Sequence, residues 1–171
     1  MDFLSYNPDY QVVICHSCQH ALVPGSIRYH LREVHKQVTK DHARACGLYF
    51  ESLPLRSIAD IQQLLPSPLT PPILHLAQFT DGYACTVCPS AHPYIVRSTT
   101  GLKRHLRERH QWVNPTRKGR ESLAVRDSPT HFSQVSRANV ACQTFLPSNR
   151  THYFEVNPQA IKQESYSLDP H

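Results

Sequence analysis

The chain has 171 residues and carries 18 Lys and Arg against 13 Asp and Glu, which gives a net charge of +5. Its length fits one domain or two very small ones, and no apolar run approaches the ~20 residues that a membrane span needs. The first residues lack the basic and apolar regions of a secretory signal, so we expect an intracellular, reducing location in which the six cysteines bind metal or are buried rather than form disulfides.

The first chemical pattern spans residues 10–37, after an N-terminal tail expected over residues 1–9. Its four potential metal ligands are Cys15, Cys18, His30 and His35. Eleven residues separate the Cys-x-x-Cys pair from the first histidine. The usual central spacing of a Cys2His2 zinc finger is about 12–15 residues, so this copy is short by one. Apolar residues stand where such a finger places its small core: Val13, Leu22 and Ile27.

Residues 38–65 are predicted to be a helical spacer between two fingers. An apolar stripe over residues 39–53 predicts one helix, and residues 57–65 predict a second, shorter one. Cys46 lies within the first stripe, so we interpret it as a core residue rather than a ligand. A Pro-rich connector over residues 66–80 follows, which we expect to be an extended, polyproline-like linker; docking into an aromatic groove is the alternative.

The first pattern returns over residues 81–112. Its four potential ligands are Cys85, Cys88, His105 and His110. The motif His-Leu-Arg-Glu-Val-His at 30–35 recurs here as His-Leu-Arg-Glu-Arg-His at 105–110, and the central spacing is sixteen residues. Tyr83 and Leu102 take the apolar positions, and Ser98-Thr99-Thr100 is typical of a helix start. Two full copies of one ligand pattern indicate two metal sites rather than scattered thiols and histidines.

The spacing of the ligands points to structural zinc. A Cys-x-x-Cys turn places both thiolates on one side of a tight bend, where each reaches zinc at about 2.3 Å. Two histidines five positions apart are about 500° apart on a helix, so the last turn must loosen for both rings to reach one ion. Four protein ligands close the site, and the metalloprotease and zinc deaminase motifs are absent. We therefore expect two zinc ions per chain and no enzyme activity.

Basic residues gather within residues 97–126, where nine of them stand with two acidic ones for a net charge of +7, whereas the rest of the chain is at −2. Seven are candidates for nucleic-acid contact: Lys103, Arg104, Arg107, Arg109, Arg117, Lys118 and Arg120. Only Arg104 stands at a base-reading position with a side chain suited to it, and 49 residues separate the fingers. We expect phosphate contacts without base readout, although a solvated basic face would give the same pattern.

The remaining residues are predicted to be a basic polar loop, a hairpin and a tail. Residues 113–134 form the loop, and residues 135–157 hold two strand-like runs around a Pro-Ser-Asn-Arg turn. Cys142, in the first run, is interpreted as a packed thiol. Residues 158–171 are predicted to be a disordered tail.

Segments spread along the chain resemble the fungal double zinc-finger domain of proteins similar to orsellinic-acid cluster protein D. They are Val-Ile-Cys-His-Ser-Cys at 13–18, Ala-Leu-Val-Pro at 21–24, the two His-Leu-Arg-Glu motifs, Pro-Pro-Ile at 71–73, Asp-Gly-Tyr-Ala-Cys-Thr-Val-Cys at 81–88, Cys-Gln-Thr-Phe at 142–145 and Tyr-Phe-Glu-Val at 153–156. The resemblance covers about residues 10–160. It implies a zinc-binding, non-enzymatic fungal domain, sometimes joined in larger chains to helicase- or recombination-type neighbours.

The sequence thus predicts a small α+β, zinc-stabilised protein with two separated ββα-type Cys2His2 fingers, an intervening helical segment and a C-terminal β-hairpin. We expect a nuclear binding module that contacts nucleic acid through the basic face of the second finger. The alternative is a protein–protein interaction module in which both zinc sites are purely structural. Neither a membrane nor a small-molecule substrate is expected.

Overall fold

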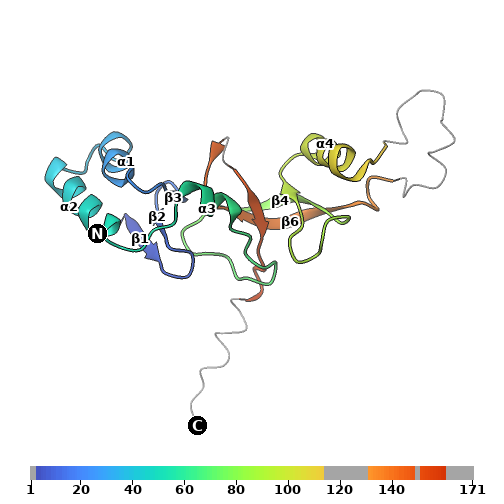
Figure 1. Ribbon diagram of the computed structural model, residues 1–171, viewed down its shortest axis with the longest axis horizontal. Coiled ribbons are helices and arrows are strands. Elements are labelled where there is room, and N and C mark those ends of the chain that lie inside the picture. The colour runs from blue at the N-terminus through green and yellow to red at the C-terminus, as the bar shows by residue number, and fades with distance from the viewer. Residues whose placement is uncertain (1–2, 114–130, 149–150, 161–171) are drawn as a thin grey trace, which may run out of the picture. The chain divides into compact units, whose positions relative to one another are not determined.

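The computed structural model describes residues 3–113, 131–148 and 151–160. These described residues form two compact units. One unit takes those that fall in the ranges 1–64, 73–77 and 144–152, and the other takes those in the ranges 65–72, 78–143 and 153–171. Each unit contains both helices and strands, as the predicted α+β class requires (Figure 1). Every helix in the described stretches is too short or too polar to traverse a lipid bilayer.

The first unit is a three-stranded antiparallel sheet with three helices. Its strands β1 (Leu4–Asn7), β2 (Val12–Cys15) and β3 (His20–Leu22) lie in the order β1-β2-β3. Its helices are α1 (Ile27–Glu33), α2 (Lys40–Glu51) and α3 (Ile58–Gln63). The side chains of Thr39 and Ser57 accept hydrogen bonds from the backbone at the starts of α2 and α3, so each helix begins where a capping residue permits it.

The core of the first unit gathers apolar residues from the sheet, α1 and α2. Its buried members are Leu4, Val13, Cys15, Leu22, Ile27, Leu31, Ala43, Cys46 and Phe50. They include all three apolar residues that the sequence assigned to the first finger core. Cys46 is 3% exposed and packs within this cluster, which confirms that it is a core residue.

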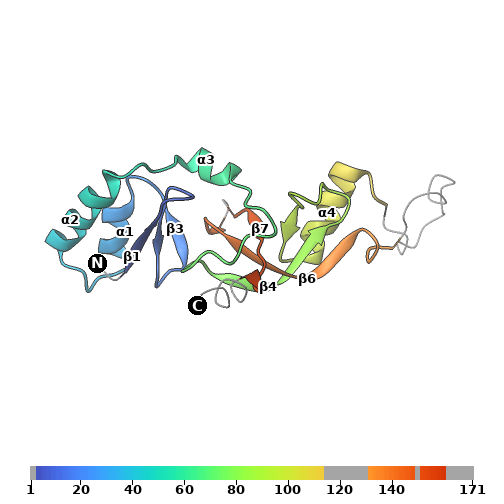
Figure 2. The same cartoon turned by 90° about the horizontal axis from the view of Figure 1, so that it is seen from below.

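The second unit is a small closed barrel with one helix packed against it. Its strands β4 (Gln78–Cys85), β5 (Ile95–Val96), β6 (Ser136–Thr144) and β7 (Tyr153–Glu155) close in the order β4-β5-β7-β6. Helix α4 (Thr99–His110) begins after Ser98, whose hydroxyl oxygen accepts a hydrogen bond from Gly101 N–H at 3.0 Å. Figure 2 shows α4 beside strand β4. Leu102 and Leu106 of α4 are buried with Cys85, Trp112 and Val135.

The two predicted ββα fingers are not formed by the described residues, because the strands belong to a three-stranded sheet and to a barrel. In the first unit β1 adds a third strand beside β2, and in the second unit β4 and β5 are parts of the barrel. All four residues of β2 are buried, so this strand needs cover on both faces, which a two-stranded hairpin lacks. The segment assigned to an N-terminal tail thus contains strand β1.

The predicted C-terminal β-hairpin is present, but as part of the barrel. Strands β6 and β7 are neighbours in the barrel order, and β6 also pairs with β4 while β7 pairs with β5. Val140 and Cys142 on β6 are buried against Ala84 and Ile95, an apolar contact that an isolated hairpin would leave in water. Cys142 is a packed thiol, as predicted.

The Pro-rich stretch contains a turn at residues 67–70, so it is not extended over its whole length. Thr70 N–H donates to Ser67 C=O at 2.9 Å, and Leu69 N–H donates to the Ser67 hydroxyl at 3.3 Å. These hydrogen bonds are those of a Ser-initiated turn. The predicted basic loop and the predicted tail fall largely on residues 114–130 and 161–171, which lie outside the described residues.

Candidate metal centres

The first group of potential ligands lies between strand β2, the turn after it and the end of α1. Cys15 ends β2, and Gln19 N–H donates to Cys15 C=O at 2.7 Å, which closes the turn that carries Cys18. Gln19 has a positive φ of 56°, a conformation that a tight turn of this kind requires. His30 stands in α1, whereas His35 follows after the helix ends at Glu33. The helix thus stops early enough for both rings to turn toward the cysteines.

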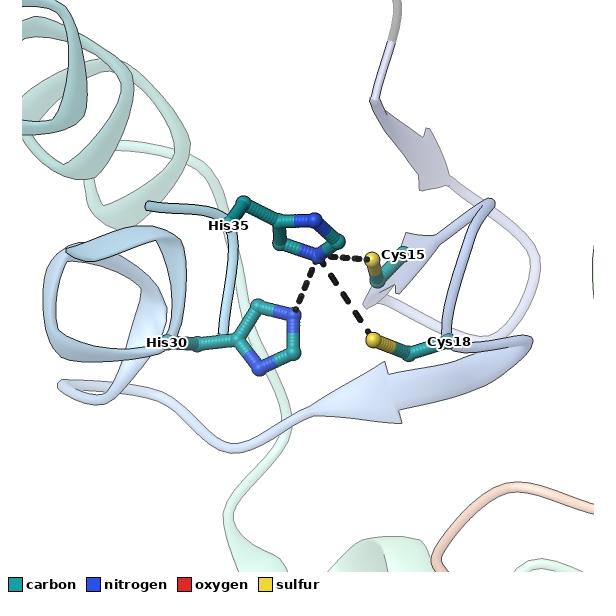
Figure 3. A group of neighbouring side chains, drawn as sticks. All are labelled: Cys15, Cys18, His30 and His35. Carbon is teal, nitrogen blue, oxygen red and sulfur yellow. Dashed lines mark hydrogen bonds between the residues drawn. The ribbon is translucent and has the colours of Figure 1, made fainter. Parts of the chain in front are cut away.

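The four side chains of this group converge on one point (Figure 3). His35 Nε2 lies 3.2 Å from Cys15 Sγ, 3.5 Å from Cys18 Sγ and 3.2 Å from His30 Nε2. One ring nitrogen carries at most one proton, so it cannot form three ordinary hydrogen bonds with these partners at once. Four lone pairs that point toward one place are the arrangement expected around a single bound cation.

The second group repeats this arrangement on the barrel and α4. Cys88 Sγ, His105 Nε2 and His110 Nε2 form a near-equilateral triangle, with separations of 3.2, 3.3 and 3.2 Å. Cys85 at the end of β4 completes the group, whose ligand atoms all lie within 4.8 Å of one another. Gln111 ends α4 in the left-handed region, and its N–H bonds to Leu106 C=O, five residues back. This widened last turn is the loosening that the histidine spacing demanded.

Both groups fit a tetrahedral metal ion. Zinc with two sulfur ligands at about 2.3 Å and two nitrogen ligands at about 2.0 Å would hold those atoms about 3.3–3.8 Å apart. The distances of 3.2–3.5 Å between ligand atoms in the first group and 3.2–3.3 Å in the second are close to that range. The structure thus brings together all eight ligands chosen from the sequence, in two groups that could each hold a metal ion.

Burial shifts the pKa values of these ligands when no cation is bound between them. Burial, followed by contact with Cys15, raises the pKa of the Cys18 thiol to about 11. Burial, followed by the charge of His35, lowers the pKa of His30 to about 4. Burial likewise raises the pKa of Cys85 and lowers that of His105. The imidazoles of His30 and His105 are therefore neutral and ready to coordinate, whereas the Cys18 thiol must lose its proton to the metal.

Aromatic rings next to the histidines are site residues that the sequence patterns did not reveal. The Tyr94 ring stacks on His105 with centroids 3.8 Å apart and an interplanar angle of 8°. In the first group the Phe3 ring faces His35 at 6.1 Å. Both aromatics lie outside the repeated ligand motif, so only the folded chain shows that they restrict the ligand rings.

The basic residues proposed for nucleic-acid contact divide into two sets. Lys103, Arg104, Arg107 and Arg109 lie on α4 with exposed side chains. Arg117, Lys118 and Arg120 lie outside the described residues. At about 100° per residue, the first three helix cations share an arc of about 100°, whereas Arg109 lies about 120° away from Lys103 on the opposite side. The basic face of α4 is thus formed by Lys103, Arg104 and Arg107.

The fold and the two groups define a small α+β protein with two Cys2His2 clusters suited to metal ions. The chain belongs to the family described as Orsellinic acid/F9775 biosynthesis cluster protein D, which it matches over residues 2–111. A curated relative with that name from Emericella nidulans is 31% identical over 156 residues, or 91% of this chain. The chain spans only 26% of the length of that relative. No solved structure matches the chain.

Proposed function

We propose that the chain is a non-catalytic binding module whose two Cys2His2 groups each hold a structural zinc ion. The observation that carries this proposal is the convergence of two thiols and two imidazoles in each group. Thiolate and imidazole together are the ligands that zinc takes in structural sites. With four protein ligands, such a site has no open position for a water or a substrate, which supports a stabilising role over a catalytic one.

The zinc ions would compensate for small cores. Units of this size bury limited apolar area, and metal binding in such units contributes free energy directly to folding. Cys15 and Cys85 are also members of the hydrophobic clusters of their units. A metal bound there would tie a β-strand to a helix in each unit, so that ligand loss and unfolding would occur together.

The partner proposed for this module is nucleic acid, contacted through the basic face of α4. Among the residues that the structure describes, Lys103, Arg104 and Arg107 form no ion pair, so their charges are available to phosphate. Lys103 Nζ lies 5.1 Å from the centre of the Phe132 ring, and this cation–π contact helps to hold the lysine side chain beside α4. Glu108 is exposed on the same helix and would disfavour a deeper approach of a polyanion. A nuclear location belongs to this proposal.

Binding of fluorescent duplex DNA to the zinc-loaded full chain, measured by anisotropy over a range of salt, tests this partner. Neutralising three phosphates predicts a slope of log K against log salt that is steeper by about 2–3 than in a Lys103→Ala/Arg104→Ala/Arg107→Ala variant. The matched control removes three exposed cations from the other unit: Arg28→Ala/Lys40→Ala/Arg44→Ala. Equal binding by the α4 variant and the wild type, or no binding at low salt, would reject the proposal.

The second candidate is a protein-interaction module in which the zinc ions only stabilise the fold. Large apolar side chains on α1 and α2 favour it, because Tyr29, Leu48 and Tyr49 are 69%, 66% and 51% exposed. Exposed apolar groups of this size are typical of contact surfaces when they gather near a concave feature. The DNA experiment separates the two candidates, since a protein-interaction module gives no salt-dependent binding through α4.

A further inference from the structure

A groove between α1 and α2 in the first unit lies outside the two Cys2His2 groups. It has a volume of about 460 Å³ and is lined by Arg28, Arg44, Gly47, Leu48 and Glu51. Four of these residues stand on α2 at positions i, i+3, i+4 and i+7, which places them in one stripe along the helix. Arg28 supplies the facing wall from α1.

Gly47 sets the shape of this groove. A Cβ added at Gly47 would lie 3.2 Å from Arg28 Cβ, so the missing side chain is what lets α1 and α2 approach closely there. Beside it Leu48 lines the groove and is 66% exposed. The groove therefore offers an apolar spot between two guanidinium groups.

The charges around the groove favour an acidic occupant. Arg28 and Arg44 line it, and exposed Arg32 and Lys40 lie one helical turn from them. The acids nearby are Glu51 in the lining and Asp41 one turn before Arg44. Within the described part of the chain, none of the four cations forms an ion pair, so carboxylates of a partner can meet them, with arginine binding a carboxylate in a two-pronged contact.

We propose that this groove binds a short acidic segment of a partner protein that carries an apolar side chain. The apolar side chain lies against Leu48, and carboxylates on either side of it pair with Arg28 and Arg44. Nucleic acid fits less well, because an exposed leucine and the Glu51 carboxylate oppose a continuous line of phosphates. The proposal does not rest on the nucleic-acid function of α4, since it uses residues of the first unit alone.

The test uses the zinc-loaded full chain and two fluorescein-labelled peptides. One peptide consists of glutamate and alanine with two leucines one helical turn apart, and the other has lysine in place of glutamate. The wild type is expected to bind the acidic peptide saturably and the basic one not at all. Leu48→Glu should weaken binding by about tenfold or more, because it replaces the apolar contact with a repulsive charge. Leu69→Glu is the matched control, because it puts the same charge on an exposed leucine that belongs to the second unit.

Charge reversal supplies a gain of function that a damaged fold cannot mimic. The Arg28→Glu/Arg44→Glu variant should lose the acidic peptide and bind the basic one instead. Circular dichroism and zinc content show whether each variant is folded. If the charge-reversed variant is not folded, Arg28→Gln/Arg44→Gln is tested in its place for loss of the acidic peptide. No saturable binding of the acidic peptide, equal binding by Leu48→Glu and the wild type, or displacement of the peptide by duplex DNA would each overturn the proposal.

Discussion

The imidazole of His105 lies flat against the phenol ring of Tyr94, with centroids 3.8 Å apart and planes 8° from parallel. His105 is also one corner of the triangle with Cys88 and His110, so the stacked tyrosine restricts the direction in which a metal ligand points. Groups that orient a ligand ring in this way tune the affinity of the site for its metal.

Replacing Tyr94 should therefore weaken metal binding at the second group only. Stacking contributes about 1 kcal/mol, so Tyr94→Ala should lower the zinc affinity of that group by about fivefold, whereas Tyr94→Phe should preserve it. Competition with a chromophoric chelator measures both affinities. An equal loss of affinity in the alanine and phenylalanine variants would show that the hydroxyl, and not the stacked ring, is what matters.

Removing one ligand should unfold its own unit. Cys15→Ser is expected to lose one zinc ion and the structure of the first unit, because the free energy of zinc binding, about 10 kcal/mol, is comparable with the whole stability of a small domain. Native mass spectrometry and backbone NMR give the metal count and the extent of disorder. Cys46→Ala is the control, since it removes a buried thiol outside the metal groups, and it should keep two ions. A Cys15→Ser protein that still binds two ions would contradict the ligand assignment.

Metal binding at the first group should release protons at neutral pH. The Cys18 thiol has a pKa of about 11 and is protonated at pH 7, whereas His30, with a pKa of about 4, is already neutral. Zinc thus displaces the Cys18 proton and none from His30, so the apparent affinity should rise with pH between about 6 and 8. Calorimetry in buffers of different ionisation enthalpy measures this release. Binding without proton release would mean that the thiol is not a ligand.

The second group should lose its metal first. In the first group only Cys18 is half-buried, whereas both Cys88 and His110 are half-buried in the second. A chelator reaches exposed ligands more easily, so a limiting amount of it should produce a one-zinc protein that keeps the first site. NMR signals of α4 should then change before those of α1. Simultaneous loss from both sites would show that exposure does not control the order.

A methyl group at Gly82 should destabilise the barrel. A Cβ there would lie 2.6 Å from Val140 C=O and 3.0 Å from Cys142 Sγ, and neither the backbone oxygen nor the packed thiol can move freely. Gly82→Ala is expected to lower the free energy of unfolding by about 1–3 kcal/mol. Chemical denaturation of the zinc-loaded chain gives this value. In Gly47→Ala the new Cβ meets Arg28 Cβ at 3.2 Å, and helix propensity offsets the crowding, so that variant should be close to neutral.

The ligand groups were predictable because their chemistry is local in sequence. A Cys-x-x-Cys turn and a histidine pair near a helix end each have a fixed spacing, so the eight side chains could be chosen without knowing the fold. The same holds for Leu102 and Ile27, whose positions relative to the ligands predicted their burial. The helix cap at Ser98 was likewise a signal within a few residues.

The sheets were not predictable, because they depend on pairing between distant segments. Strand β1 has the unremarkable sequence Leu-Ser-Tyr-Asn and becomes a strand by pairing with β2. Strand β6 pairs with β4 across more than 50 residues of sequence, for example between Gln78 and Gln143. No local sequence pattern predicts such a long-range contact. The Ser67–Thr70 turn was hidden by prolines that equally favour an extended linker.

The zinc content of the purified full chain tests the central proposal most directly. Native mass spectrometry of the protein, compared with its mass after denaturation in acid, counts the metal ions that the fold retains. Two zinc ions per chain, one for each Cys2His2 group, is the predicted result. A folded chain that retains one ion or none after purification with zinc present would contradict the account.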